Sequence, residues 1–159
     1  MKVTDVLTKE FIIPELKGRE KREVLEEMSE ELAGKVEGLN KERLLELLLE
    51  REKLGSTGIG HGVAIPHTKI KGIDGIIVAF GRSKKGVDFQ SMDNRPVHIF
   101  FLIVAPEDST VLHLKVLASI SRLLKDGAFR KKLIKASTKE DIYRIIEEED
   151  NKVLKSAIA

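Results

Sequence analysis

The fold and the kind of site are indicated most clearly by residues 55–67, which read GSTGIGHGVAIPH. Four glycines fall within eight residues, and a short apolar run follows that ends at Pro66-His67. The spacing is neither that of a dinucleotide-binding turn nor that of a Walker loop, because no Gly-Lys-Ser/Thr follows and no helix opens directly after it. On its own, such a loop is more often a tight turn than a phosphate cradle.

Strands are predicted on both sides of this loop. Continuous apolar runs at residues 76–80 and 97–104 predict buried strands, and the second is expected to be central because both of its faces are apolar. Residues 93–96 predict the turn between them. Further upstream, the run at residues 11–13, closed by Pro14, predicts a short strand.

Helices are predicted between and after these strands. The predicted spans are residues 19–33, a helix capped by Asn40 and stopped by Gly55, and residues 109–125, 129–135 and 139–148. Arg51 continues the apolar stripe of the second helix, so we expect it to point inward. Alternating strands and helices predict one α/β domain over residues 1–150, with helices on both faces of a mixed sheet and a polar tail at 151–159.

The composition excludes several functional classes. The 159 residues include 28 basic and 26 acidic ones, a formal net charge of +2, which gives no footprint for nucleic acid or an anionic membrane. No cysteine is present, so disulfides, thiolate metal sites and a cysteine nucleophile are excluded. No apolar run is long enough to span a membrane and the N-terminus is no signal peptide, so we expect a cytoplasmic protein.

Four histidines are candidates for chemistry, and each has a plain structural interpretation; His67 simply follows a proline at the end of an apolar run. His98 lies inside the most apolar strand, where a hydrogen-bonded structural role is expected. His61 is expected to be an exposed residue of the glycine loop. His113 opens the buried face of a helix that follows the strand ending at Val104, where free backbone N–H groups favour anions, although a satisfied core histidine is at least as common there.

The whole string from Glu50 to His67 resembles the active-site signature of the enzyme IIA domains of the phosphoenolpyruvate-dependent sugar phosphotransferase system. The similar branch is the fructose–mannitol class, which includes nitrogen-regulatory members. Residues 86–89, 95–97 and 104–106, followed by His113-Leu114, also resemble this family in order and spacing. The resemblance covers essentially the whole chain.

This resemblance implies a three-layer α/β/α sandwich with a mixed sheet, and a phosphotransferase that carries a phosphoryl group on a histidine. It makes His67 the phosphorylated residue, His113 the second active-site histidine and Arg51 the arginine near the phosphoryl group. Ser56 and Thr57 are expected to line the same site. An imidazole is suited to this role because it is partly neutral near pH 7, and the protein has chiefly to position it and neutralise charge.

The resemblance also implies the partners. The phosphocarrier protein HPr would donate the group, and a separate enzyme IIB or a regulatory target would accept it, without metal, cofactor, nucleic acid or membrane insertion. The chain departs from the family at two positions: Thr68 replaces a usually small residue and would crowd a partner, and His61 stands where Asn or another polar residue is common.

Other functions remain open at this point. Phosphorylation could be read by a binding partner without sugar transport, or the chain could be a non-phosphorylated interaction module, against which the retention of His67, His113 and Arg51 argues. A zinc site of His61, His67 and His113 would need a further ligand and a second shell of hydrogen bonds. For transfer between proteins we expect an open, shallow site with an apolar rim, drawn from Ile59, Val63 and Ile65.

Overall fold

The sheet is organised around its most apolar strand. The computed structural model describes residues 1–158, and side chains up to residue 156. Strand β6 (Val97–Pro106) pairs antiparallel with β5 (Ile77–Val87) on one side, and parallel with β3 (Val63–Ala64) and then β4 (His67–Ile70) on the other. The expected central position of this strand is confirmed.

Two short strands complete the six-stranded mixed sheet. Strand β1 (Ile12–Ile13) pairs parallel with β5, and β2 (Gly58–Gly60) pairs antiparallel with β3, so the glycine loop enters the sheet at its edge. Strand β5 extends seven residues beyond the predicted end at Phe80, because β6 continues to pair with it past that point.

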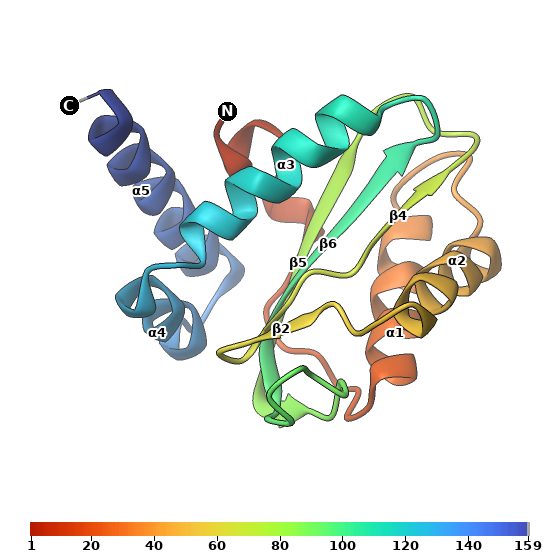
Figure 1. Ribbon diagram of the computed structural model, residues 1–159, viewed down its shortest axis with the longest axis horizontal. Helices are drawn as coiled ribbons and strands as arrows, with labels where there is room; N and C mark the ends of the chain where they lie inside the picture. Colours follow the sequence, from red (N-terminus) through yellow and green to blue (C-terminus); the bar gives the residue numbers. More distant parts are fainter. Residues whose placement is uncertain (159) are drawn as a thin grey trace.

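Helices cover both faces of the sheet and give the expected three layers (Figure 1). Helices α1 (Lys21–Ala33) and α2 (Lys41–Lys53) pack on the face that carries Phe100 and Leu102. Helices α3 (Thr110–Leu123), α4 (Gly127–Lys135) and α5 (Lys139–Ile158) lie on the face that carries Phe101 and Ile103. Alternate residues of β6 therefore belong to two separate cores.

Local signals set most helix ends as predicted. The Asn40 side chain accepts a hydrogen bond from the Arg43 backbone N–H at 2.8 Å, which caps α2. Asp126 caps α4 in the same way through the N–H groups of Ala128 and Phe129, so this helix starts two residues before the expected Phe129.

The C-terminal helix is the main correction. The predicted end at Glu148 is wrong, because α5 continues to Ile158 and crosses the expected boundary between domain and tail. A contact distant in sequence holds α5 just beyond its predicted end. The buried Asp150 carboxylate accepts hydrogen bonds of 2.9 Å from the N–H groups of Val3 and Thr4, in the 3-10 turn Val3–Asp5. Figure 1 shows α5 beside this N-terminal segment.

Candidate functional site

The structure brings two of the predicted site residues together. His67 begins β4, and His113 lies in the first turn of α3, which follows the carboxyl end of β6. Because β4 pairs in parallel with the end of β6, the two rings meet edge to face, with centroids 5.3 Å apart and an interplanar angle of 76°. The histidine pair therefore lies at the carboxyl end of the central strand, next to a helix N-terminus.

The backbone fixes the orientation of the His67 ring. Nδ1 of His67 lies 2.7 Å from the carbonyl oxygen of Ile65. A carbonyl can only accept a hydrogen bond, so Nδ1 carries a proton, and in the neutral ring Nε2 has the free lone pair. The His67 side chain is half-buried, and Nε2 is the ring nitrogen available as a nucleophile.

His113 supplies a second imidazole that is held neutral. It is 6% exposed, and burial lowers its pKa, with the electrostatic influence of the neighbouring His67 and Lys69 side chains acting in the same direction. Its Nδ1 is buried and has no hydrogen-bond partner among the residues that the structure describes. An unpaired buried nitrogen, on a ring that lies against the candidate nucleophile, fits a position at which a ligand supplies the missing partner.

Arg51 lies in the last turn of α2, the helix that packs on β4. The side chain is half-buried, and its Nη1 donates a hydrogen bond of 2.9 Å to the carbonyl oxygen of Gly55. No hydrogen bond joins it to either histidine in the described part of the chain. The observed contact ties Arg51 to the start of the glycine loop.

The hydroxyl groups of Ser56 and Thr57 are occupied within the loop. Ser56 Oγ donates to the carbonyl oxygen of Phe89 at 3.1 Å and accepts from the Gly58 N–H at 3.1 Å. Thr57 is 4% exposed and donates its hydroxyl to the buried carboxylate of Glu52. In this structure both side chains shape the loop, and a direct bond from either hydroxyl to a phosphoryl group would require a rotation.

Comparisons with known proteins agree with this arrangement. The family model described as "Phosphoenolpyruvate-dependent sugar phosphotransferase system, EIIA 2" matches residues 5–149. The chain belongs to this family. It is 42% identical over 146 residues to a nitrogen regulatory protein of Bradyrhizobium diazoefficiens, covering 92% of this chain and 95% of that one.

Two further relatives extend the comparison. The chain is 41% identical over 152 residues to the fructose-specific EIIABC component of Bacillus subtilis, covering 94% of this chain but 24% of that longer protein. The crystal structure of the nitrogen regulatory protein IIA-Ntr from Neisseria meningitidis superposes with a TM-score of 0.84 at 32% identity, covering 91% of this chain and 98% of that one. Sugar-specific and nitrogen-regulatory enzyme IIA proteins are thus both similar to this chain.

Two residues near the site of this enzyme IIA domain were missed from the sequence. Glu52 is 7% exposed and accepts hydrogen bonds from the Thr57 N–H at 3.1 Å and from its hydroxyl, while Lys21 Nζ lies 3.0 Å from the same carboxylate. The sequence did hold a sign of the buried position of Glu52, because this residue falls on the apolar stripe of α2, one turn after Leu48. Lys69 Nζ donates to Thr110 Oγ1 at 2.6 Å and so joins β4 to the first residue of α3.

The two remaining histidines behave as expected. His61 is exposed and adopts a left-handed backbone conformation with φ of 57° between two glycines. His98 forms a hydrogen bond of 2.8 Å between Nδ1 and the Ser83 carbonyl oxygen. Across residues 1–158, no group of three His, Asp or Glu side chains is placed to hold a metal ion.

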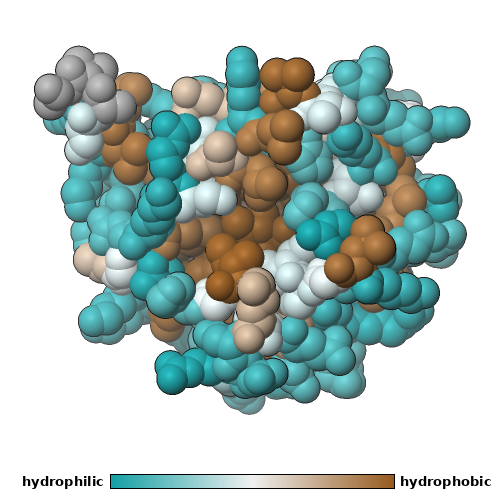
Figure 2. Space-filling view, in the orientation of Figure 1, coloured by the Kyte–Doolittle hydropathy of each residue, from teal (hydrophilic) through white to brown (hydrophobic). Residues whose placement is uncertain are grey.

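The surface around the histidine pair is partly apolar. Exposed large apolar side chains occur at or beside the glycine loop (Leu54, Ile59 and Met92) and on α3, which carries His113 (Val111 and Leu114). Figure 2 shows apolar side chains in and around a hollow framed by α3, β2 and α2, with mostly hydrophilic residues outside it. Of the predicted rim residues, Ile59 is 48% exposed, whereas Val63 and Ile65 belong to the core.

The larger cavities lie elsewhere. Clefts of about 590 and 850 Å³ are lined by α1, α2 and their flanking residues, without His67 or His113. Among the described residues, no helix is both long and apolar enough to cross a membrane.

Proposed function

We propose that Nε2 of His67 accepts a phosphoryl group from phosphorylated HPr and passes it to an enzyme IIB partner for sugar uptake. The observation that carries this proposal is the Nδ1–H···O=C bond between His67 and Ile65, which leaves Nε2 as the nucleophile. In the first transfer the P–N bond of phosphorylated HPr breaks as the Nε2–P bond of His67 forms. In the second, the Nε2–P bond breaks as the acceptor side chain forms its own bond to phosphorus. No metal is needed, because the donor is a phosphohistidine.

The neighbouring groups suit the phosphoryl oxygens. Nδ1 of His113 lacks a protein partner and would find one in a phosphoryl oxygen on His67 if it carries the proton. Arg51 uses Nη1 for the Gly55 carbonyl, and its permanent charge lies at the end of the helix that packs on β4. Ser56 and Thr57 contribute by shaping the loop. We propose a cytoplasmic location, because the proposed donor chain starts from phosphoenolpyruvate.

Phosphorylation with purified components tests the proposal. Incubation with phosphoenolpyruvate, enzyme I and HPr from the same organism should label one histidine, as an acid-labile and alkali-stable adduct. NMR of the adduct should identify the Nε2 isomer. The His61→Ala variant, which removes an exposed histidine, serves as the matched control and should label fully. Labelling of the Nδ1 isomer, or of any residue other than His67, would overturn the assignment.

A regulatory role is the second candidate. It is favoured by the 42% identity to a nitrogen regulatory protein along nearly the full length of both chains. In this case the phosphorylated and free forms would bind a target protein differently, without transfer to enzyme IIB. Mixing the phosphorylated protein with the enzyme IIB proteins of the same organism separates the two roles, since loss of label to any of them supports transport.

A further inference from the structure

A cavity of about 550 Å³ lies where residues 14–19 pass residues 82–85 of β5. Neither histidine of the proposed phosphoryl site lines it. Its lining is rich in cations and contains a single carboxylate: Lys17, Arg19, Arg82, Lys84, Lys85 and Glu15. In a chain with 28 basic and 26 acidic residues, this is a strong local excess of positive charge.

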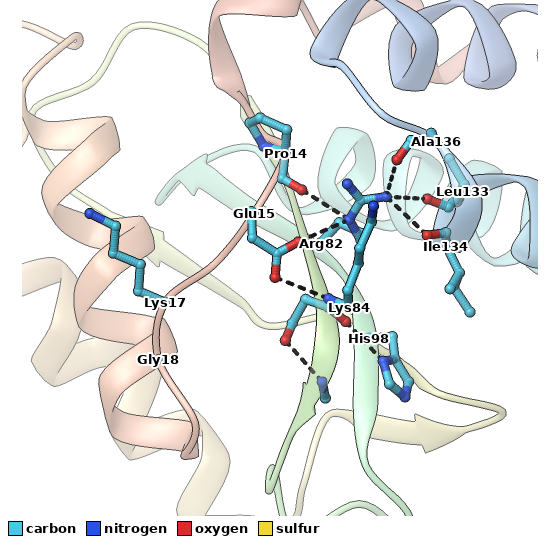
Figure 3. Close-up of polar contacts among 12 residues, drawn as sticks. Pro14, Glu15, Lys17, Gly18, Arg82, Lys84, His98, Leu133, Ile134 and Ala136 are labelled. Carbon is cyan, nitrogen blue, oxygen red and sulfur yellow. Dashed lines mark hydrogen bonds and ion pairs between the residues drawn. The ribbon is translucent and has the colours of Figure 1, made fainter.

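Arg82 forms a fixed positive wall of this cavity. The residue is 2% exposed, and its Nη1 donates to the carbonyl oxygens of Leu133, Ile134 and Ala136 at 2.6–3.1 Å, at the end of α4. Nε donates to the Pro14 carbonyl oxygen at 2.9 Å. Figure 3 shows these contacts, with the remaining nitrogen, Nη2, bearing no hydrogen bond to the described residues. The guanidinium is therefore held rigidly and keeps an unused donor.

The other cations around Arg82 are exposed and have no carboxylate partner among the residues described. Arg19, Lys84 and Lys85 are exposed, and none forms a salt bridge with a carboxylate in the described part of the chain. Glu15 is already engaged, since one oxygen lies 3.4 Å from Arg82 Nε and the other accepts the Lys84 backbone N–H at 3.1 Å. In Figure 3 the Lys84 side chain extends toward the guanidinium, whereas Lys17 points away toward α1.

We propose that this cavity binds a compact anion that carries at least two phosphate groups. Exposed lysines bind a single charge weakly, so a ligand must engage several of these cations at once. The volume of the cavity falls in the range of small-molecule sites. A nucleic acid would instead need a basic stripe along a face, and the balanced charge of the rest of the chain does not provide one.

Titration with inorganic pyrophosphate tests this proposal. The His67→Ala variant is used as the parent, so that binding at the proposed phosphoryl site does not contribute. We expect saturable binding, with backbone amide NMR shifts confined to residues 14–19, 82–86 and 136–137. The affinity should fall as salt is raised from about 50 to about 200 mM. Orthophosphate, with one phosphate group, should bind at least about tenfold more weakly than pyrophosphate.

Two variants locate the site. The double substitution Lys84→Ala and Lys85→Ala should weaken pyrophosphate binding about tenfold or more without changing the melting temperature, because both side chains are exposed. Lys125→Ala removes an exposed lysine outside the cavity and should bind as the parent does. The proposal is overturned if no saturable binding occurs up to about 10 mM, if the shifts lie elsewhere, or if the double variant binds as tightly as the parent. These outcomes are independent of whether His67 is phosphorylated.

Discussion

Nδ1 of His67 is hydrogen-bonded to the carbonyl oxygen of Ile65, two residues earlier in the same chain segment. This bond needs no distant partner, because Pro66 lies between the two residues and the backbone itself presents the acceptor. It fixes both the ring orientation and the tautomer. Loss of the imidazole should therefore affect chemistry much more than folding.

The first prediction follows from this local bond. His67→Ala should abolish labelling by phosphorylated HPr while lowering the free energy of unfolding by no more than about 1 kcal/mol, since the ring is half-buried and makes one hydrogen bond. Urea unfolding and a labelling assay measure the two effects. Persistent labelling of this variant would show that another residue accepts the group.

Arg51 and His113 should matter for the rate of transfer. Replacing either by Ala should slow phosphorylation of His67 by an amount equivalent to about 2–4 kcal/mol of transition-state stabilisation, by analogy with the loss of one oxyanion-hole donor. Rapid-quench kinetics with phosphorylated HPr measure this effect. Glu50→Ala, at an exposed neighbouring position on α2, is the control and should transfer at the parent rate.

Glu52 should stabilise the loop that precedes His67. Glu52→Ala leaves the Lys21 ammonium and the Thr57 N–H without their buried partner, so the free energy of unfolding should fall by about 2–4 kcal/mol. Thr57→Val should cost less, because it keeps the backbone bond to Glu52. Chemical denaturation of the parent, Glu52→Ala and Thr57→Val proteins ranks their free energies of unfolding. A Glu52→Ala variant as stable as the parent would contradict this account.

The lowered pKa of His113 predicts a dependence of stability on pH. Below the ordinary histidine pKa of about 6.5, the unfolded chain binds a proton at this position while the folded protein resists it. The unfolded state then binds more protons, so this contribution to stability is present above about pH 6.5 and is lost as the pH falls toward the folded-state pKa. His113→Gln should show a flatter fall in unfolding free energy between about pH 7 and pH 5.

The exposed apolar rim should bind the phosphoryl donor. Ile59→Lys places a charge in the surface next to the histidine pair, so the KM for phosphorylated HPr should rise about tenfold with little change in kcat. Leu154→Lys is the matched control, because Leu154 is 42% exposed but lies on α5, and its KM should equal that of the parent. An equal effect of both substitutions would argue against a defined docking surface.

Short-range signals predicted much of this fold correctly. The apolar run at 97–104 is buried on both faces and became the central strand, and Asn40 caps α2 through its own side chain. The family resemblance carried by residues 50–67 and His113 was sufficient to predict the three-layer architecture. The strand and the helix cap depend on residues that are close in sequence, so their periodicity and capping chemistry are visible there, whereas the three layers followed from the resemblance.

The tertiary structure decided what those residues touch. The meeting of His67 with His113 requires β4 to pair with β6, and the bonding of Asp150 to the N-terminal turn brings together residues at opposite ends of the chain. Ser56 and Thr57 are suited by type to contact a phosphoryl group, yet their hydroxyls are bound to Phe89 and Glu52. Sequence alone thus determined which groups are present and which local elements they form. Only folding decided their partners, because a hydroxyl or a carboxylate bonds to whichever group the packing of distant segments brings within reach.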